Sequence, residues 1–354
     1  MSSRQLFFLY ILTVPAFKVA MLPSYLAGEV GQDMWLSIAF MMLIDIAVLC
    51  GIVFIKTRVG LLEYSGGVKL VLSKVIAVLC AVYFLFQAVV YFEEIVAFLL
   101  QSFFDEADRL QIIVPLVVAI AYIAYKGERT LGRISEILIW SLLLAILVSI
   151  AFNNAEIDFS NLLPIMDSGA KGVFGGYKSI VWFGDYLPLL FINLKDRRKR
   201  RYGYVFGGAG VILLMVVFIN ATFYSQWGDL TKNVPNAFYR LSGYNFISAD
   251  VGKIDWLVIL TWIASCVMKL ALLLLGVRGA INHIFRKDVS KISIPVSGAF
   301  VGLCIVFFIK EVKTSYQIAT NLWIVGVGVT ILTILTLIVC AILNKRMVKN
   351  EQNI

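Results

Sequence analysis

Charged residues are scarce in this chain of 354 residues: they make up only 15% of it, whereas 60% of the residues are hydrophobic and the mean hydropathy is +0.89. This apolar fraction exceeds what the core of a soluble protein of this size can bury. A net charge of +9 does not indicate nucleic-acid binding, because no soluble stretch is long enough to carry a basic patch. The composition therefore predicts a protein whose solvent is the lipid bilayer.

Residues typical of metal sites and catalytic centres are equally sparse. The one histidine, His283, stands among polar residues on a predicted loop, where a solvated side chain is expected. The cysteines occur singly in apolar runs without CxxC spacing, which favours buried thiols over a metal site or a disulfide framework (Cys50, Cys80, Cys266, Cys304, Cys340). The sequence has no hydrolase or phosphate-binding motif, so neither enzyme activity nor a cofactor is expected.

Long apolar runs fill most of the chain. A membrane span needs roughly 20 apolar residues, and ten runs approach that length, the fourth and ninth being short. The N-terminal run has no small-residue cleavage site, so it is interpreted as a first span and not as a removable signal peptide. We expect a single membrane domain over 1–354 with ten transmembrane helices near 6–27, 35–55, 75–104, 110–125, 134–152, 174–194, 202–225, 254–277, 293–310 and 317–344.

The distribution of Lys and Arg predicts the orientation. One set of alternate loops carries 21 of these residues and the opposite set only 8, and cytoplasmic loops carry the excess. The first set, which includes both termini, is therefore assigned to the cytoplasm. The basic run KDRRKRR at 195–201 is interpreted as a topology anchor beside anionic lipid headgroups.

Ten spans divide into two halves of five, 1–155 and 156–350, and an odd number per half makes the second half enter the membrane from the opposite side. Transporters with such an inverted repeat interrupt the first helix of each half near the membrane midplane. The corresponding runs here contain Pro15 in the first, and Gly184 with Pro188 in the sixth. We expect both helices to be broken at these residues, with a binding site at the breaks.

Ionisable residues inside the spans each require a partner or a function, because a charge at the bilayer centre costs about 2.5 to 3.5 kcal/mol on insertion scales. Lys18 lies about 15 Å from the outer end of its span at a rise of 1.5 Å per residue, which is the midplane, and Asp185 reaches a similar depth. A Lys18–Asp185 pair is therefore predicted to be geometrically feasible. Three roles stay open for it: a structural clamp, a counter-charge for a zwitterionic ligand, or a proton-sensing couple.

Three further charges lie in apolar runs. Glu94, and not its neighbour Glu93, is predicted to face the interior, since adjacent helical residues point about 100° apart. Lys269 lies near the cytoplasmic end of its span, where its side chain can either reach the membrane surface or remain buried, and both interpretations stay open. Asp45 is interpreted first as a hydrogen-bonding group between helices.

Several segments resemble one family along the chain. Residues 21–27 (MLPSYLA) with 31–35 (GQDMW) are similar to a family pattern LPxxLAxxAGxDxW, and residues 157–164 (IDFSNLLP) also correspond. Residues 183–185 (FGD) resemble FGE, and 253–256 (KIDW) resemble the start of ERLDxxxxxxW. On these segments the chain resembles the spore germination permeases, the B subunits of nutrient germinant receptors. It departs from the pattern where Asp185 replaces Glu and Lys253 replaces Arg.

The resemblance implies a member of the amino acid, polyamine and organocation transporter superfamily, with the same five-plus-five inverted-repeat fold. It implies a nutrient sensor of the inner spore membrane that works with a larger A-type subunit and a lipoprotein C-type subunit. Transferred to this chain, the ligand pocket would comprise Thr13, Val14, Pro15, Ala16, Phe17, Lys18, Tyr91, Glu94, Phe183, Gly184, Asp185, Thr261, Ser265 and Lys269.

Three functions are consistent with these features. The first is a receptor that binds a small nutrient, with an amino acid as the expected ligand, and signals through its partners. The second is a proton-coupled amino acid transporter in which Asp185 or Glu94 carries the proton while Lys18 or Lys269 stands where a cation would bind. The third is a scaffold that no longer binds a ligand. For the outer segment 227–253 the roles of a lid, a partner contact or both stay open, and its aromatic residues are expected to rest at the membrane interface.

Overall fold

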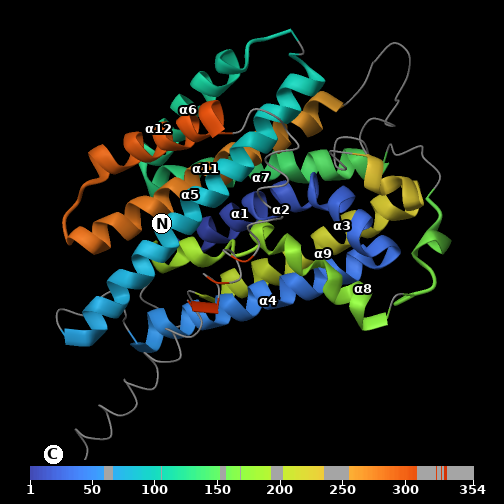
Figure 1. Cartoon of the computed structure of the whole chain (residues 1–354), viewed down its shortest axis with the longest axis horizontal. Coiled ribbons are helices and arrows are strands. Elements are labelled where there is room, and N and C mark those ends of the chain that lie inside the picture. Colours follow the sequence, from blue (N-terminus) through green and yellow to red (C-terminus); the bar gives the residue numbers. More distant parts are fainter. Residues whose placement is uncertain are drawn as a thin grey trace, which may run out of the picture.

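The computed structural model describes residues 1–59, 67–104, 106–151, 157–167, 169–192, 202–234 and 255–308, together with Ile324, Gly328, Ile331 and Leu332. Over these residues the fold is all-helical, and no β-strand occurs among them. The helices form an elongated bundle in which α1 and α2 lie in the middle, α6 and α12 lie along one side and α4 lies along the other (Figure 1). The first helix is thus surrounded by other helices, and it packs against α7, α9 and α11.

The elements follow one another along the chain with mostly short connections. They are α1 (Ser3–Thr13), α2 (Pro15–Lys18), α3 (Leu22–Val30), η1 (Gly31–Asp33), α4 (Met34–Phe54), η2 (Ile55–Val59), α5 (Gly67–Ser102), α6 (Arg109–Lys126), α7 (Glu128–Ala151), η4 (Phe159–Leu162), α8 (Gly169–Gly175), η5 (Gly176–Trp182), η6 (Leu187–Leu190), α9 (Gly203–Trp227), η8 (Gly228–Asn233), α11 (Asp255–Phe285) and α12 (Ser290–Phe308). Here η2 is a π-helical turn and the other η elements are 3₁₀ helices.

Seven helical segments of the described chain are long and apolar enough to cross a membrane. They correspond to seven of the predicted spans, from the second (α4) to the ninth (α12) with the sixth left out. The predicted first and sixth spans are helical but interrupted. The predicted tenth, 317–344, lies almost entirely outside the described residues. The chain is thus a multi-pass α-helical membrane protein.

The first helix breaks where the sequence predicts. The helix α1 begins with a capping box, in which Ser2 and Gln5 bond each other's backbone N–H, and it ends at Thr13. Pro15 then stands at the first position of α2, where its missing N–H leaves no helical bond unmade. After four residues the chain turns again and α3 begins. The first membrane segment is therefore three short helices.

The sixth helix is interrupted as well. The helix η5 ends at Trp182, Phe183 is extended, and Gly184 has a φ of +86°, a conformation that residues with a side chain rarely adopt. Pro188 lies in the first turn of η6, where its ring is tolerated. Gly184 thus allows the chain to turn, and Pro188 lies at the start of the next helix.

Two predictions about single residues are wrong. His283 does not lie on a solvated loop, because α11 continues to Phe285, and its Nε2 lies 3.0 Å from the Ser73 hydroxyl of α5. Cys50 is exposed on the outer face of α4, whereas Cys80 and Cys266 are buried as predicted. An apolar run predicts that a cysteine lies in the membrane, but not whether it faces lipid or protein. Cys340, the basic run 195–201 and the part of the outer segment from 235 to 254 lie outside the described residues.

Candidate functional site

Four charged side chains meet at the two helix breaks, and we refer to them as the charge quartet: Lys18 of α2, Asp45 of α4, Asp185 between η5 and η6, and Lys269 of α11. Both lysines donate hydrogen bonds to Asp185, each to a different carboxylate oxygen. The Nζ of Lys18 also lies 3.7 Å from Oδ2 of Asp45. None of the four residues is more than 2% exposed. Two positive and two negative charges are thus held together in the protein interior.

The quartet confirms one pairing and settles two open points. Lys18 pairs with Asp185, as the depths of the two residues predict. Lys269 is buried and does not snorkel to the surface, since its ammonium group reaches Asp185. Asp45 is the hydrogen-bonding group between helices that the sequence favours, but it is also an ion-pair partner of Lys18.

Side chains from other helices satisfy the backbone exposed by the break in the sixth helix. The N–H of Gly184 donates to Oδ1 of Asp45 at 2.8 Å. The carbonyl of Phe183 accepts from the Tyr83 hydroxyl at 2.9 Å and from Nε2 of Gln87 at 2.7 Å. A buried backbone group without a partner would be costly in a membrane, so these contacts hold the break open. The sequence interpretation missed Tyr83 and Gln87, although their spacing of four residues puts them on one face of α5.

The break in the first helix has a similar arrangement. Nε1 of Trp262 on α11 donates to the carbonyl of Ala16 at 2.6 Å, and Nδ2 of Asn220 on α9 donates to the carbonyl of Lys18 at 3.3 Å. These carbonyls stand where the helical ladder is interrupted. Helices α9 and α11 therefore fix the conformation of α2 from two sides.

We expect Trp262→Phe to lower the free energy of unfolding by about 1 to 3 kcal/mol, because it leaves the buried carbonyl of Ala16 without its donor. Thermal unfolding of the purified protein in detergent measures this change. Trp140→Phe is the matched control, since Trp140 is 70% exposed. Equal effects of the two substitutions would show that the indole N–H does not support the break.

The two adjacent acids of the third span, Glu93 and Glu94, have different partners. Glu94 accepts a hydrogen bond from Nε1 of Trp182 at 2.9 Å, which ties it to the sixth segment, and its second oxygen is buried with no hydrogen-bond partner among the described residues. Glu93 is fully buried and pairs with Arg109 at the start of α6. Glu94 thus faces the interior as predicted, but Glu93 does too, through a partner from another helix.

Aromatic rings surround the ammonium groups of the quartet. Phe17 and Tyr91 stack with their centroids 4.2 Å apart. The Nζ of Lys18 lies 4.5 Å from the centre of the Phe183 ring, and that of Lys269 lies 5.8 Å from the centre of the Tyr91 ring. Both distances suit cation–π contacts. These rings therefore stabilise the two ammonium groups of the quartet.

The other predicted pocket residues on the first and eighth spans are buried but bond within their own helices. The hydroxyl of Thr13 donates to the carbonyl of Leu9, and that of Ser265 donates to the carbonyl of Thr261, both at 2.8 Å. Val14 and Pro15 are buried beside them and make no polar side-chain contact. Lys18 and Lys269 of the predicted set therefore meet at Asp185. Glu94 bonds Trp182 instead, and the hydroxyl members are not hydrogen-bonded to Asp185.

Two tyrosines of the broken segments lie beside the quartet. The rings of Tyr10 and Tyr186 meet edge to face, with centroids 5.0 Å apart, and both side chains are buried. Neither hydroxyl has a hydrogen-bond partner within the described part of the chain. Buried hydroxyls of this kind can each bond a polar ligand atom.

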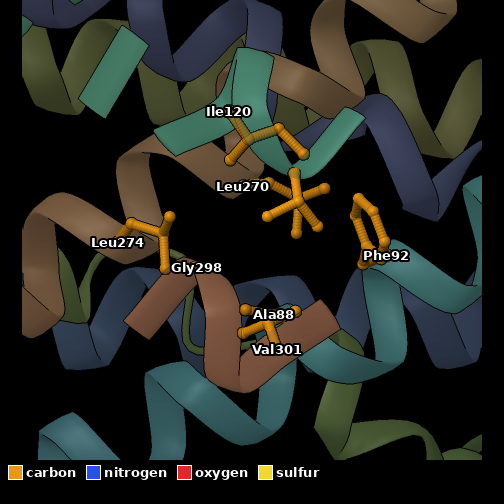
Figure 2. Close-up of a pocket in the computed structure, with 8 residues that line it drawn as sticks. Ala88, Phe92, Ile120, Leu270, Leu274, Gly298 and Val301 are labelled. Carbon is orange, nitrogen blue, oxygen red and sulfur yellow. The ribbon is translucent and has the colours of Figure 1, made fainter. Parts of the chain in front are cut away.

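A small apolar pocket lies away from the quartet, between α5, α6, α11 and α12. Figure 2 shows the side chains of Phe92, Ile120, Leu270 and Val301 around it, and every drawn lining atom is carbon. It offers no partner for a charged or polar ligand. In the described residues, moreover, no group of 3 or more His, Cys, Asp or Glu side chains could hold a metal ion. Within the described residues, the charge quartet at the helix breaks therefore remains the candidate site for a polar ligand.

Comparison with known proteins gives one family. The family described as spore germination protein, the spore permeases, matches residues 1–295. No match to an individual curated protein was found. The matched region contains both broken helices and all four members of the quartet.

Proposed function

Since the chain belongs to the spore germination protein family, we propose that this germination-related membrane protein is the subunit of a nutrient receptor that binds the nutrient. The family is one of membrane permeases and receptors and not of enzymes. The observation that carries the proposal is the charge quartet at the two helix breaks, because it offers buried groups of both signs at one place. The ligand class that matches both signs is a zwitterion, and an amino acid is the expected nutrient.

Charge balance supports a zwitterion over a singly charged ligand. Lys18 and Lys269 share Asp185, so a ligand carboxylate that bonds one lysine replaces one of the carboxylate oxygens of Asp185. The ligand ammonium group then faces Asp185 or the second oxygen of Glu94, and the hydroxyls of Tyr10 and Tyr186 are further partners. The exchange leaves the interior neutral, whereas an anion would add an unbalanced buried charge.

Binding would act as a signal by shifting an equilibrium between two conformations. The proposed architecture is a ten-helix inverted repeat, with halves 1–155 and 156–350, both termini in the cytoplasm and the chain in the inner spore membrane. Partner subunits of the A and C types would read the conformation. The interruption of the first and sixth membrane segments at corresponding places supports this architecture.

A thermal-shift panel of amino acids on the purified chain tests the proposal. We expect one or two amino acids to raise the melting temperature, since a ligand at 100 times its Kd stabilises the folded state by about 2.7 kcal/mol. Lys18→Met and Glu94→Gln should abolish the shift. Lys178→Met is the control, because Lys178 forms an exposed ion pair with Glu29. If no amino acid shifts the wild-type protein, or if all three variants respond alike, the helix breaks are not the ligand site.

Transport is the second candidate function, and the observation that favours it is the pairing of a buried acid with two lysines. A lysine within the membrane can stand in for a transported cation, and a neighbouring acid can carry a proton. Uptake of the stabilising amino acid by proteoliposomes, abolished by Glu94→Gln, would support a transporter. Binding without uptake would support the receptor. A germination response that survives the pocket substitutions would instead indicate a scaffold.

A further inference from the structure

A second site is found on the outer face of the bundle, where α5, α11 and α12 enclose a groove. It has a volume of about 420 Å³, and its walls are formed mainly by Leu85, Ile281, Phe285, Ile292, Val296 and Phe300. Several of these side chains are open to the surroundings: Phe285 is 65% and Ile292 is 68% exposed. Helices α11 and α12 lie side by side at this place and are joined by a short turn (Figure 1). The groove faces lipid, because this helix pair crosses the membrane.

The groove ends at a basic turn. From Phe285 on α11 back to Val277, and from Ile292 on α12 to Phe300, the groove follows nine residues of each helix, or about 12 Å. At the open end of this length lie Arg286, Lys287 and Lys291, all of them exposed. The charge distribution of the loops assigns this end to the cytoplasmic surface.

Further groups around the turn add to its positive charge. Lys74 of α5 and Arg286 both interact electrostatically with His283, so α5 contributes a cation to the same end. The acid of the turn, Asp288, accepts hydrogen bonds from the backbone and the hydroxyl of Ser290 and from Asn282. These hydrogen bonds lower the pKa of Asp288, so it is ionised. Its carboxylate is already hydrogen-bonded to Ser290 at the start of α12. Arg278 of α11 also interacts electrostatically with Asp288, so basic side chains outnumber the acid of the turn among the described residues.

A buried hydroxyl lies in the first turn of α12, at the basic end of the groove. Ser293 lines the groove, is only 8% exposed, and its Oγ makes no hydrogen bond to any described residue. A serine in this position of a helix usually bonds the carbonyl one turn back, as Ser297 does with Ile294. The hydroxyl of Ser293 is therefore available to a polar group of an occupant, and it lies two residues along α12 from Lys291.

We propose that this groove binds an anionic phospholipid, with an acyl chain between α5, α11 and α12, an ester group at Ser293 and the phosphate at Lys287 and Lys291. The groove combines a cationic end, a buried hydroxyl in the first turn of α12 and apolar walls, and a phospholipid offers a partner for each of the three. Basic pockets between membrane helices on the cytoplasmic side are known to bind anionic headgroups. The site is separate from the nutrient site and does not rest on its assignment.

The test compares phosphatidylglycerol with phosphatidylcholine of the same acyl chains, added to the full chain in detergent and followed by thermal shift. We expect about tenfold tighter apparent binding of phosphatidylglycerol, since each basic residue near the surface contributes to anionic lipid binding. Lys287→Gln with Lys291→Gln should remove the preference, and Val296→Trp should weaken both lipids by filling the groove. Matched controls are Arg129→Gln with Arg133→Gln, also exposed basic residues on the predicted cytoplasmic side, and Leu303→Trp on the exposed face of α12.

Three results would overturn the proposal. Equal affinity for the two lipids would exclude headgroup recognition. Equal loss in the arginine control would show only a general attraction to anionic micelles. Displacement of phosphatidylglycerol by glycerol phosphate at equal concentration would assign the basic turn to a soluble phosphate and not to a lipid.

Discussion

Replacing Asp185 with Asn is expected to lower the free energy of unfolding by about 3 to 5 kcal/mol and to abolish the germination response. The substitution keeps the shape of the side chain but removes the charge that both Lys18 and Lys269 bind. Two buried ammonium groups would then share Asp45 alone, and breaking a buried ion pair by removing one partner costs this much. Thermal and denaturant unfolding in detergent measure the stability, and a spore germination assay measures the response.

A charge-balanced double variant separates two effects of the substitution: the unbalanced buried charge and the altered nutrient site. In Asp185→Asn combined with Lys269→Met, one Lys18–Asp45 pair remains and the interior is neutral again. We therefore expect the double variant to be more stable than Asp185→Asn alone, while still failing to respond to nutrient. Asp167→Asn, at an exposed position, is the control for the chemical change itself. A double variant less stable than the single one would show that the quartet is not held together by charge balance.

Gly184→Ala is expected to lower the free energy of unfolding by about 2 to 3 kcal/mol and to weaken nutrient binding. The φ of +86° disfavours any residue with a Cβ by about 1 to 2 kcal/mol. A Cβ at this position would also lie 3.0 Å from the Tyr83 hydroxyl oxygen and 3.1 Å from a carbon of its ring. Tyr83 would have to move, and its hydrogen bond to the carbonyl of Phe183, worth about 1 kcal/mol, would weaken. Unfolding curves and the amino acid thermal shift measure the two effects.

Gly207→Ala is the matched control for this change. Gly207 lies inside α9, and a Cβ there meets no atom within 4 Å. Alanine is the better helix former by about 0.5 to 1 kcal/mol, so this control should be neutral or stabilising. Equal losses in both variants would mean that the turn at Gly184 does not require glycine and that Tyr83 adapts without loss.

The helix breaks could be predicted from the sequence because the residues that cause them act locally. Pro15 lacks a donor wherever it stands, and Gly184 with Pro188 marks an interruption through backbone preferences alone. The depth of Lys18 and Asp185 follows from counting residues at a constant rise per residue. For these features no information about neighbouring helices is needed.

The rest of the quartet depends on helix rotation and packing, which one sequence does not contain. Depth alone leaves open whether Lys269 reaches the surface or the interior, and only the packing of α11 against α5 and α7 decides it. The roles of Tyr83 and Gln87 depend likewise on which face of α5 meets the sixth segment. The burial of Glu93 could not be predicted for the same reason, since its partner Arg109 belongs to the next helix.

The composition of the quartet has a consequence for the electrical behaviour of the protein. One elementary charge that crosses a potential of 100 mV changes in energy by about 2.3 kcal/mol. Because the quartet holds two lysines and two aspartates, its rearrangement as a unit moves no net charge through the field, and neither does the entry of a zwitterion. We therefore expect occupancy of the site to be independent of membrane voltage. The proposed nutrient sensor would then respond whether or not the membrane is energised.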